Sequence, residues 1–149
     1  MNLEYLDLPK VPDHLIIDVY QTIRNTPLTD RHSEPKQSDA EKHNAWNSIK
    51  ASNQLKEFTK SIFNFEHDVH IFMLSGNLPV HKDNTRDTAY NYVLETGGAI
   101  TNFHNSDTHE IIEHHNITPL VWHRLNVSQH HSVEITNPPR ILISVSVHW

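Results

Sequence analysis

Apolar positions recur with helical spacing in the first third of the chain. They lie on one face of the stretch VPDHLIIDVYQTIRN, where Asp13 follows a proline in the position of an N-cap. Residues 25–43 are polar, contain two prolines and predict a loop, in which Ser38 and Glu41 have the spacing of a capping box. A second helix is expected from about Trp46 to Phe58, because its large apolar side chains fall on one side.

From residue 66 onward the pattern changes to that of strands. Short runs rich in β-branched and aromatic residues are separated by Gly, Pro, Asn, Asp and Ser: HDVHIFML, LPVHKD, TAYNYVL, AITNF, LVWHRL, HSVEI and RILISVSV. Short strands at close, regular spacing indicate an all-β sandwich or barrel. We therefore expect one domain over residues 1–149, with residues 1–65 as a helical buttress and loop and residues 66–149 as the β-core.

The last of these runs, residues 140–147, alternates strictly between two faces. Arg140, Leu142, Ser144 and Ser146 share one face, and the other face is wholly apolar and is expected to pack in the core. An arginine is thereby left on the opposite face of a strand in a small β-domain. Arginine is favoured where a carboxylate is held by two parallel hydrogen bonds.

Composition limits the chemistry. The 149 residues, about 17.3 kDa with 36% hydrophobic side chains and a mean hydropathy of -0.58, suit one soluble globular domain. There is no cysteine, so any metal must be held by His, Asp or Glu. The net charge of -6 and the absence of a Lys/Arg cluster argue against nucleic acid or membrane partners. Without a bilayer-spanning run or a secretory signal, the expected location is cytoplasmic.

A candidate metal site begins at LPVHKD. His81 and Asp83 are separated by one residue in an apparent strand, so both are expected on the same face. A third ligand from another strand would complete a two-histidine, one-carboxylate triad, which leaves open positions on Fe(II). His131 begins a candidate strand 48 residues after Asp83, and Arg140 follows nine residues later. Alone, the pair is a weak signal, and the alternative is an exposed pair at a strand end.

Together these residues resemble a known family. The ordered set His81-x-Asp83, His131 and Arg140 is similar to the Fe(II)/2-oxoglutarate-dependent dioxygenases, which fold as a double-stranded β-helix, a cupin-like jelly roll. The stretch ETGGAITNF looks like the Gly-Gly strand entry common among them. HKDNTRDTAYNYVL and HHSVEITNPPRILISVSV look like the aspartyl/asparaginyl β-hydroxylase-like branch, over roughly residues 68–147. Several members of that branch have glycine in place of the carboxylate ligand, so Asp83 fits the general superfamily better.

The resemblance implies a mainly β jelly roll with the N-terminal helices packed against it, and a metal centre within it. Fe(II) would be held by His81, Asp83 and His131, with no catalytic residue beyond these ligands. In the family pattern the distal histidine precedes a small residue and a valine, as in HSV, which selects His131. His130 would then point to the opposite face as a neighbour.

The same resemblance implies a cosubstrate. Arg140 would hold the C5 carboxylate of 2-oxoglutarate, with help from Ser144, and Asn91 would contact the cosubstrate. An equally good interpretation is that Asn91 is an inward-facing polar residue that forms hydrogen bonds with the protein itself. The reaction would consume O2 and 2-oxoglutarate, release succinate and CO2, and hydroxylate a primary substrate that the sequence does not identify.

Two other interpretations remain open at this point. A non-catalytic, cupin-like module would hold a metal or a small acid without turnover, and a structural β-domain would carry its histidines incidentally. The stretch HNSDTHEIIEHH, residues 104–115, misses the zincin spacing by one residue and predicts a polar loop. Tyr92 and Trp122 are expected in the core.

Overall fold

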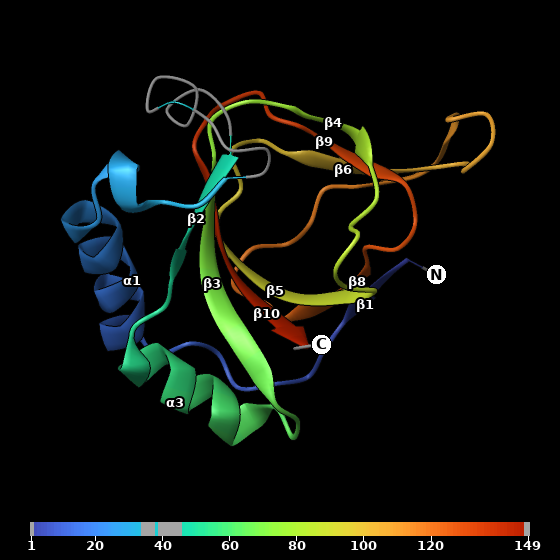
Figure 1. Ribbon diagram of the computed structural model, residues 1–149. Helices are drawn as coiled ribbons and strands as arrows, with labels where there is room; N and C mark the ends of the chain where they lie inside the picture. The colour runs from blue at the N-terminus through green and yellow to red at the C-terminus, as the bar shows by residue number, and fades with distance from the viewer. Residues whose placement is uncertain (1, 34–37, 39–45, 148–149) are drawn as a thin grey trace.

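A computed structural model of the chain describes residues 2–33, 38 and 46–147. Two antiparallel sheets face each other, and the helices lie outside the larger sheet (Figure 1). The larger sheet has the order β1-β8-β5-β10-β3-β2 and contains β1 Leu3–Tyr5, β2 Trp46–Lys50, β3 His67–Leu74, β5 Thr88–Glu95, β8 His123–Asn126 and β10 Arg140–Val147. The smaller sheet has the order β4-β9-β6-β7 and contains β4 Leu78–His81, β6 Ile100–His104, β7 Ile111–His115 and β9 His131–Glu134. The helices are α1 Asp13–Asn25, α3 Asn53–Ile62 and a short 3-10 turn, η1 Leu28–Asp30.

The strand order defines the architecture. From β3 to β10 the chain crosses between the sheets, which gives four strands in the order β8-β5-β10-β3 opposite four in the order β4-β9-β6-β7. All described pairings between these strands are antiparallel. This is the double-stranded β-helix, the cupin-type jelly roll, with helices packed against it. The predicted fold class is confirmed.

The outer face of the larger sheet is covered by the helices. On β10, Ile141, Ile143 and Val145 are buried in a cluster that includes Leu15 of α1 and Leu55 of α3. Each large aliphatic side chain buried in this way contributes on the order of 2 kcal/mol. The apolar face predicted for residues 140–147 therefore packs between sheet and helices, and its end residue, Val147, is exposed.

The inner face of the same sheet faces the smaller sheet, and the space between the two sheets, here called the chamber, is occupied by side chains from both. Leu142 of β10 and Val93 of β5 belong to its apolar cluster, together with Phe103 of the smaller sheet. Alternation along each strand therefore turns Arg140 and Ser144 into the chamber, beside Leu142. The inner face is the polar one, and it holds the candidate site.

Two expectations for the N-terminal region were wrong. Residues 46–50 form strand β2 rather than part of a helix, because they pair in register with β3 at the edge of the larger sheet. Tertiary pairing overrides the local pattern here, and α3 begins only after Ser52, whose hydroxyl caps the Leu55 amide. In α1 the N-cap is Pro12, and Asp13 lies inside the first turn. Of the predicted capping box, Glu41 lies outside the described residues.

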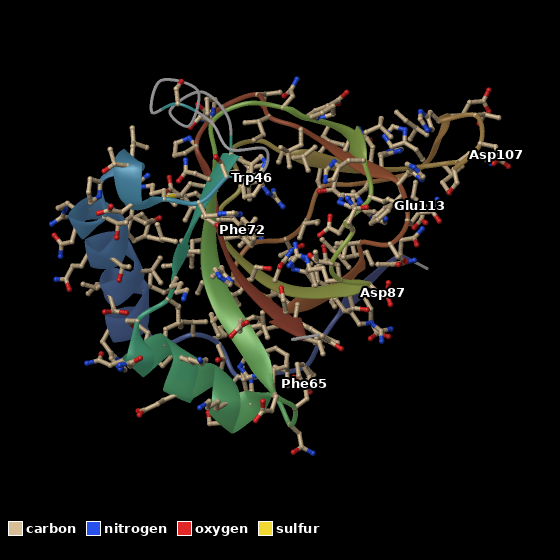
Figure 2. All side chains as sticks on the ribbon, in the orientation of Figure 1. Trp46, Phe65, Phe72, Asp87, Asp107 and Glu113 are labelled. Atoms are coloured by element: carbon tan, nitrogen blue, oxygen red, sulfur yellow. The ribbon has the colours of Figure 1, made fainter. Side chains whose placement is uncertain are left out.

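Two differences concern the β-core. The polar stretch 104–115 is not only a loop, since Ile111–His115 pair with β6 as strand β7, and Asp107 lies at the far tip of this hairpin (Figure 2). Three of the five side chains in β7 are polar, so the apolar pattern of the sequence did not indicate this edge strand. Strand β4 ends at His81, so Asp83 follows the strand instead of belonging to it. No helix within the described ranges is both long and apolar enough to cross a membrane.

Candidate metal centre

His81 and Asp83 are brought to the rim of the chamber by β4 and the segment after it. The amide of Asp83 donates to the carbonyl of Val127 at 3.0 Å, which fixes the backbone just beyond the strand. The Asp83 carboxylate turns toward the His81 ring, with 3.7 Å between Oδ1 and Nε2. The two side chains predicted to share a strand face are therefore neighbours, although a backbone hydrogen bond outside the strand places the second one.

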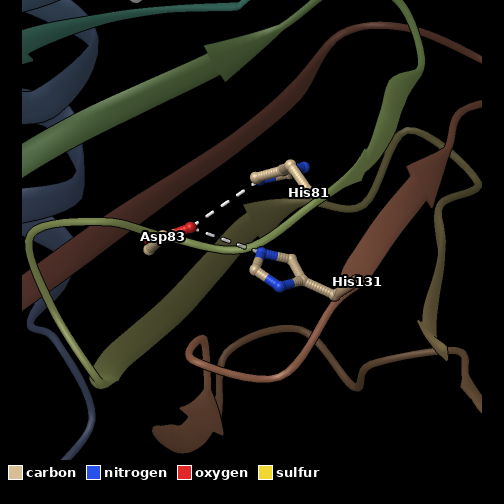
Figure 3. A group of neighbouring side chains, drawn as sticks. All are labelled: His81, Asp83 and His131. Atoms are coloured by element: carbon tan, nitrogen blue, oxygen red, sulfur yellow. Dashed lines mark ion pairs between the residues drawn. The ribbon is translucent and has the colours of Figure 1, made fainter. Parts of the chain in front are cut away.

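His131 starts β9, directly opposite His81 in the register of the smaller sheet. Its Nε2 lies 3.5 Å from Asp83 Oδ1, and the two imidazole rings are 4.3 Å apart between centroids. Figure 3 shows both rings and the carboxylate converging on one point. The ligand atoms of all three side chains lie within 4.8 Å of one another. The structure thus brings together the three residues that the sequence proposed as ligands.

Both histidines are oriented for ligation through the same ring nitrogen. His81 Nδ1 lies 2.7 Å from the carbonyl of Pro79, and His131 Nδ1 lies 2.7 Å from the carbonyl of Gln129. A carbonyl only accepts, so each Nδ1 carries a proton and each Nε2 points toward Asp83, where its unprotonated form can bind a metal. Metal-binding histidines commonly donate their other N–H in this way.

The spacing of these atoms fits a single divalent ion. With ligand bonds of about 2.1 Å, two ligand atoms are separated by about 3 Å at a right angle and by at most about 4.2 Å. The separations of 3.5 and 3.7 Å lie inside that range. Two imidazoles and one carboxylate are a donor set that suits a metal such as Fe(II).

Arg86 holds the second oxygen of Asp83. Its Nε donates to Asp83 Oδ2 at 2.6 Å, and its Nη1 donates to Ser144 at 3.0 Å and to Ser146 at 2.7 Å. Its guanidinium also lies over the Phe72 ring, 5.6 Å from the centroid. Oδ2 is engaged in this way, so Oδ1 is left to face the two imidazoles. The sequence did not indicate this role for Arg86.

The charges around the triad favour an ionised Asp83 and a neutral His81. Burial would raise the pKa of Asp83, but hydrogen bonds and charge from His131 and Arg86 outweigh it and lower that pKa. Burial lowers the pKa of His81, the more exposed of the two rings. A carboxylate and an unprotonated imidazole are the forms that bind metal.

Arg140 lies deep in the chamber with little to neutralise it. It is 3% exposed, and its contact with protein oxygen is a long 3.4 Å hydrogen bond to the carbonyl of Thr96. Within the described residues no carboxylate forms an ion pair with it. Burial lowers its pKa to about 10. A buried guanidinium without a counter-ion is suited to binding an anion.

The other predicted cosubstrate residues lie on the chamber wall but are not grouped with Arg140. Ser144 is four residues further along β10, about 13 Å at about 3.3 Å per residue, and its hydroxyl accepts from Arg86. Asn91 is its partner on β5, and His123 is in turn the partner of Asn91 on β8. Asn91 Oδ1 and His123 Nε2 are buried and have no hydrogen-bond partner among the described residues. Sequence reasoning did not find His123, because no local pattern distinguishes it.

Among the described residues, no other histidine joins the triad. His130 contacts Ser106 through Nδ1 at 3.2 Å, and its ring lies 5.3 Å from that of His109. His104 is buried behind the smaller sheet with both ring nitrogens bonded. Across residues 2–33, 38 and 46–147, the triad is the one group of three or more His, Asp or Glu side chains close enough to share an ion. The 104–115 cluster therefore does not form a second centre.

Fold and site together define a cupin-type jelly roll with a His-Asp-His group at its rim. No protein-family model and no curated protein sequence matches the chain. Among solved structures, one of oxalate decarboxylase, concerned with an element that modulates proton-coupled electron transfer, aligns with a TM-score of 0.47 at 15% identity over 78% of this chain and 28% of that one. Oxalate decarboxylase from Bacillus subtilis at pH 4.6 aligns with a TM-score of 0.44 at 16% identity, over 69% and 25%. The chain spans about a quarter of these neighbours, so we base the fold on the strand order alone.

Proposed function

We propose that the chain is an Fe(II)- and 2-oxoglutarate-dependent oxygenase that hydroxylates a still unidentified substrate. The observation that carries this proposal is a pair of features in one chamber. A His-Asp-His group stands at the rim, and a buried arginine with no counter-ion among the described residues stands on the inner wall. A metal explains the first feature, and an anionic ligand explains the second.

In this proposal His81 and His131 bind the metal through Nε2, and Asp83 binds it through Oδ1. Arg86 keeps Asp83 ionised and oriented, because it occupies the other carboxylate oxygen. Arg140 takes the far carboxylate of 2-oxoglutarate in two parallel hydrogen bonds. When bound, Fe(II) supplies the oxygen activation that no side chain provides, and the protein supplies position and shielding from water.

Succinate formation tests the activity. The purified chain is mixed with Fe(II), 2-oxoglutarate and O2, and succinate is measured, since uncoupled turnover does not need the primary substrate. His130→Ala is the matched control for His131→Ala, because the two residues are adjacent in sequence and only His131 faces the triad. Wild type and His130→Ala should form succinate, and His131→Ala should not. Equal succinate from His131→Ala and wild type would refute the proposal.

A second candidate is a module that binds a metal and a small acid without turnover. One observation favours it: the His81 side chain is 37% exposed, so the described residues do not seal the centre from water. This candidate needs the same triad and the same arginine. It predicts normal binding of both ligands and no succinate, so the assay above separates the two candidates.

A further inference from the structure

The chamber wall carries polar groups that the fold itself leaves unsatisfied. His123, Asn91 and Ser144 are cross-strand partners on β8, β5 and β10, and they form one row on the inner face of the larger sheet. Ser144 is bonded to Arg86. Its two neighbours in the row each keep a buried polar atom without a partner, Nε2 of His123 and Oδ1 of Asn91. Such atoms are rare in folded proteins and call for an explanation.

Other buried histidines of this chain show that the fold normally satisfies an imidazole. Both ring nitrogens of His67 and both of His104 lie within 2.9 Å of a protein oxygen. His131 uses one nitrogen on a carbonyl and turns the other to Asp83. His123 is fully buried, yet its one hydrogen bond to a described residue is a long 3.4 Å approach to the carbonyl of Val121. Of these four buried rings, only that of His123 has a nitrogen without a polar partner among the described residues.

We infer that His123, with Asn91 beside it, binds a carboxylate oxygen of the small acid that the chamber takes. The inference rests on the proposed function, because it adds two hydrogen-bond donors to the site in which Arg140 holds that acid. Arg140 is close enough for its charge to act on the His123 ring. While Arg140 holds the acid, a carboxylate oxygen of the acid at this place would accept from the imidazole, and both unsatisfied positions would gain a partner.

The imidazole takes part as a neutral donor. Burial, with the charge of Arg140 as a smaller contribution, lowers the pKa of His123 to about 4, so the ring is uncharged at neutral pH. The 3.4 Å contact to Val121 holds a proton on Nδ1 only weakly. When the acid binds, the proton lies on Nε2 and donates to the carboxylate. The ring gains and loses one proton, and its charge does not change. Asn91 donates from Nδ2 once its amide is rotated by a half turn.

Affinity for 2-oxoglutarate tests the inference. Titration calorimetry is done on the Zn(II)-loaded protein, which binds the acid but cannot turn it over. His123→Phe should weaken the affinity on the order of tenfold, the usual effect of one lost hydrogen bond to a charged group. His123→Gln should recover part of it, since its amide can donate near the same place. His104→Phe, which breaks two hydrogen bonds behind the smaller sheet, should leave the affinity unchanged.

A spectroscopic readout separates binding from a structural role and needs no variant. Nitrogen-15 shifts of His123 in the wild-type Zn(II) form should report Nδ1–H without acid and Nε2–H with 2-oxoglutarate. Unchanged shifts, or full affinity in His123→Phe while Arg140→Met loses it, would overturn the inference and leave the proposed function intact. If the wild-type Zn(II) form binds no 2-oxoglutarate at all, both the inference about His123 and the proposed function are wrong.

Discussion

Replacing Arg140 by an apolar residue should stabilise the ligand-free protein and weaken its binding of 2-oxoglutarate. Arg140 is 3% exposed, and burial lowers the pKa of its guanidinium to about 10, well below its usual value. At about 1.4 kcal/mol per pKa unit, the buried charge costs about 3 kcal/mol of folding free energy at neutral pH. This penalty disappears only above the folded pKa, so it is present in full at pH 7. Methionine is apolar and of similar length, and it would lie beside Leu74 and Leu142 without that penalty.

We therefore expect Arg140→Met to raise the free energy of unfolding by about 1–3 kcal/mol. The same change removes one member of a desolvated charge pair with the bound acid, which typically costs about 2–5 kcal/mol. That corresponds to roughly thirtyfold to several-thousandfold weaker binding of 2-oxoglutarate. Arg140→Lys should recover only part of the affinity, because an ammonium lacks the planar pair of donors. Fe(II) affinity should be nearly unchanged, because Arg140 is not among the three side chains whose ligand atoms converge.

Urea denaturation measures the change in the free energy of unfolding. Titration of 2-oxoglutarate into the anaerobic Fe(II) protein, followed by charge-transfer absorption, measures the change in affinity. A loss of several kcal/mol of stability together with unchanged affinity would refute the reasoning, because Arg140 would then be a structural residue. Loss of both would mean that the variant is damaged, and Arg140→Lys, which keeps the charge, would then decide the question by its affinity.

Three further predictions follow from the structure. His81→Ala and His131→Ala should each abolish tight Fe(II) binding measured by equilibrium dialysis, whereas His130→Ala should bind normally; equal loss in all three would mean that the register is wrong. Gly97→Ala should destabilise the protein by about 1–2 kcal/mol in urea, because φ is +62° and the new Cβ would crowd the start of β10; unchanged stability would contradict this. The pKa of His123 falls on folding from about 6.5 to about 4, so the unfolded chain takes up the proton first and stability is lost as pH falls through this window. Between pH 7.5 and 5 the wild type should lose about 2 kcal/mol more than His123→Gln, and equal losses would refute the burial argument.

Much of the architecture follows from the sequence because strand periodicity is a local property. The alternation in residues 140–147 is enough to separate the apolar face, which packs on the helices, from the face that carries Arg140. The choice of His131 over His130 follows from the family resemblance, in which the distal histidine precedes a small residue and a valine, and the structure turns His131 to Asp83 and His130 to Ser106. In both cases the residues next to the position in the chain are enough to make the prediction.

What only the tertiary structure decided depends on pairing between distant segments. Residues 46–50 look helical by spacing and become a strand because β3 offers an open edge. Ser144 was expected beside Arg140, but a side chain from the β4–β5 connection, Arg86, reaches its hydroxyl first. His123 gains its place opposite Asn91 from the register of β8 against β5. Register joins residues far apart in sequence, so no local period predicts which polar groups meet in the chamber or which of them is left without a partner.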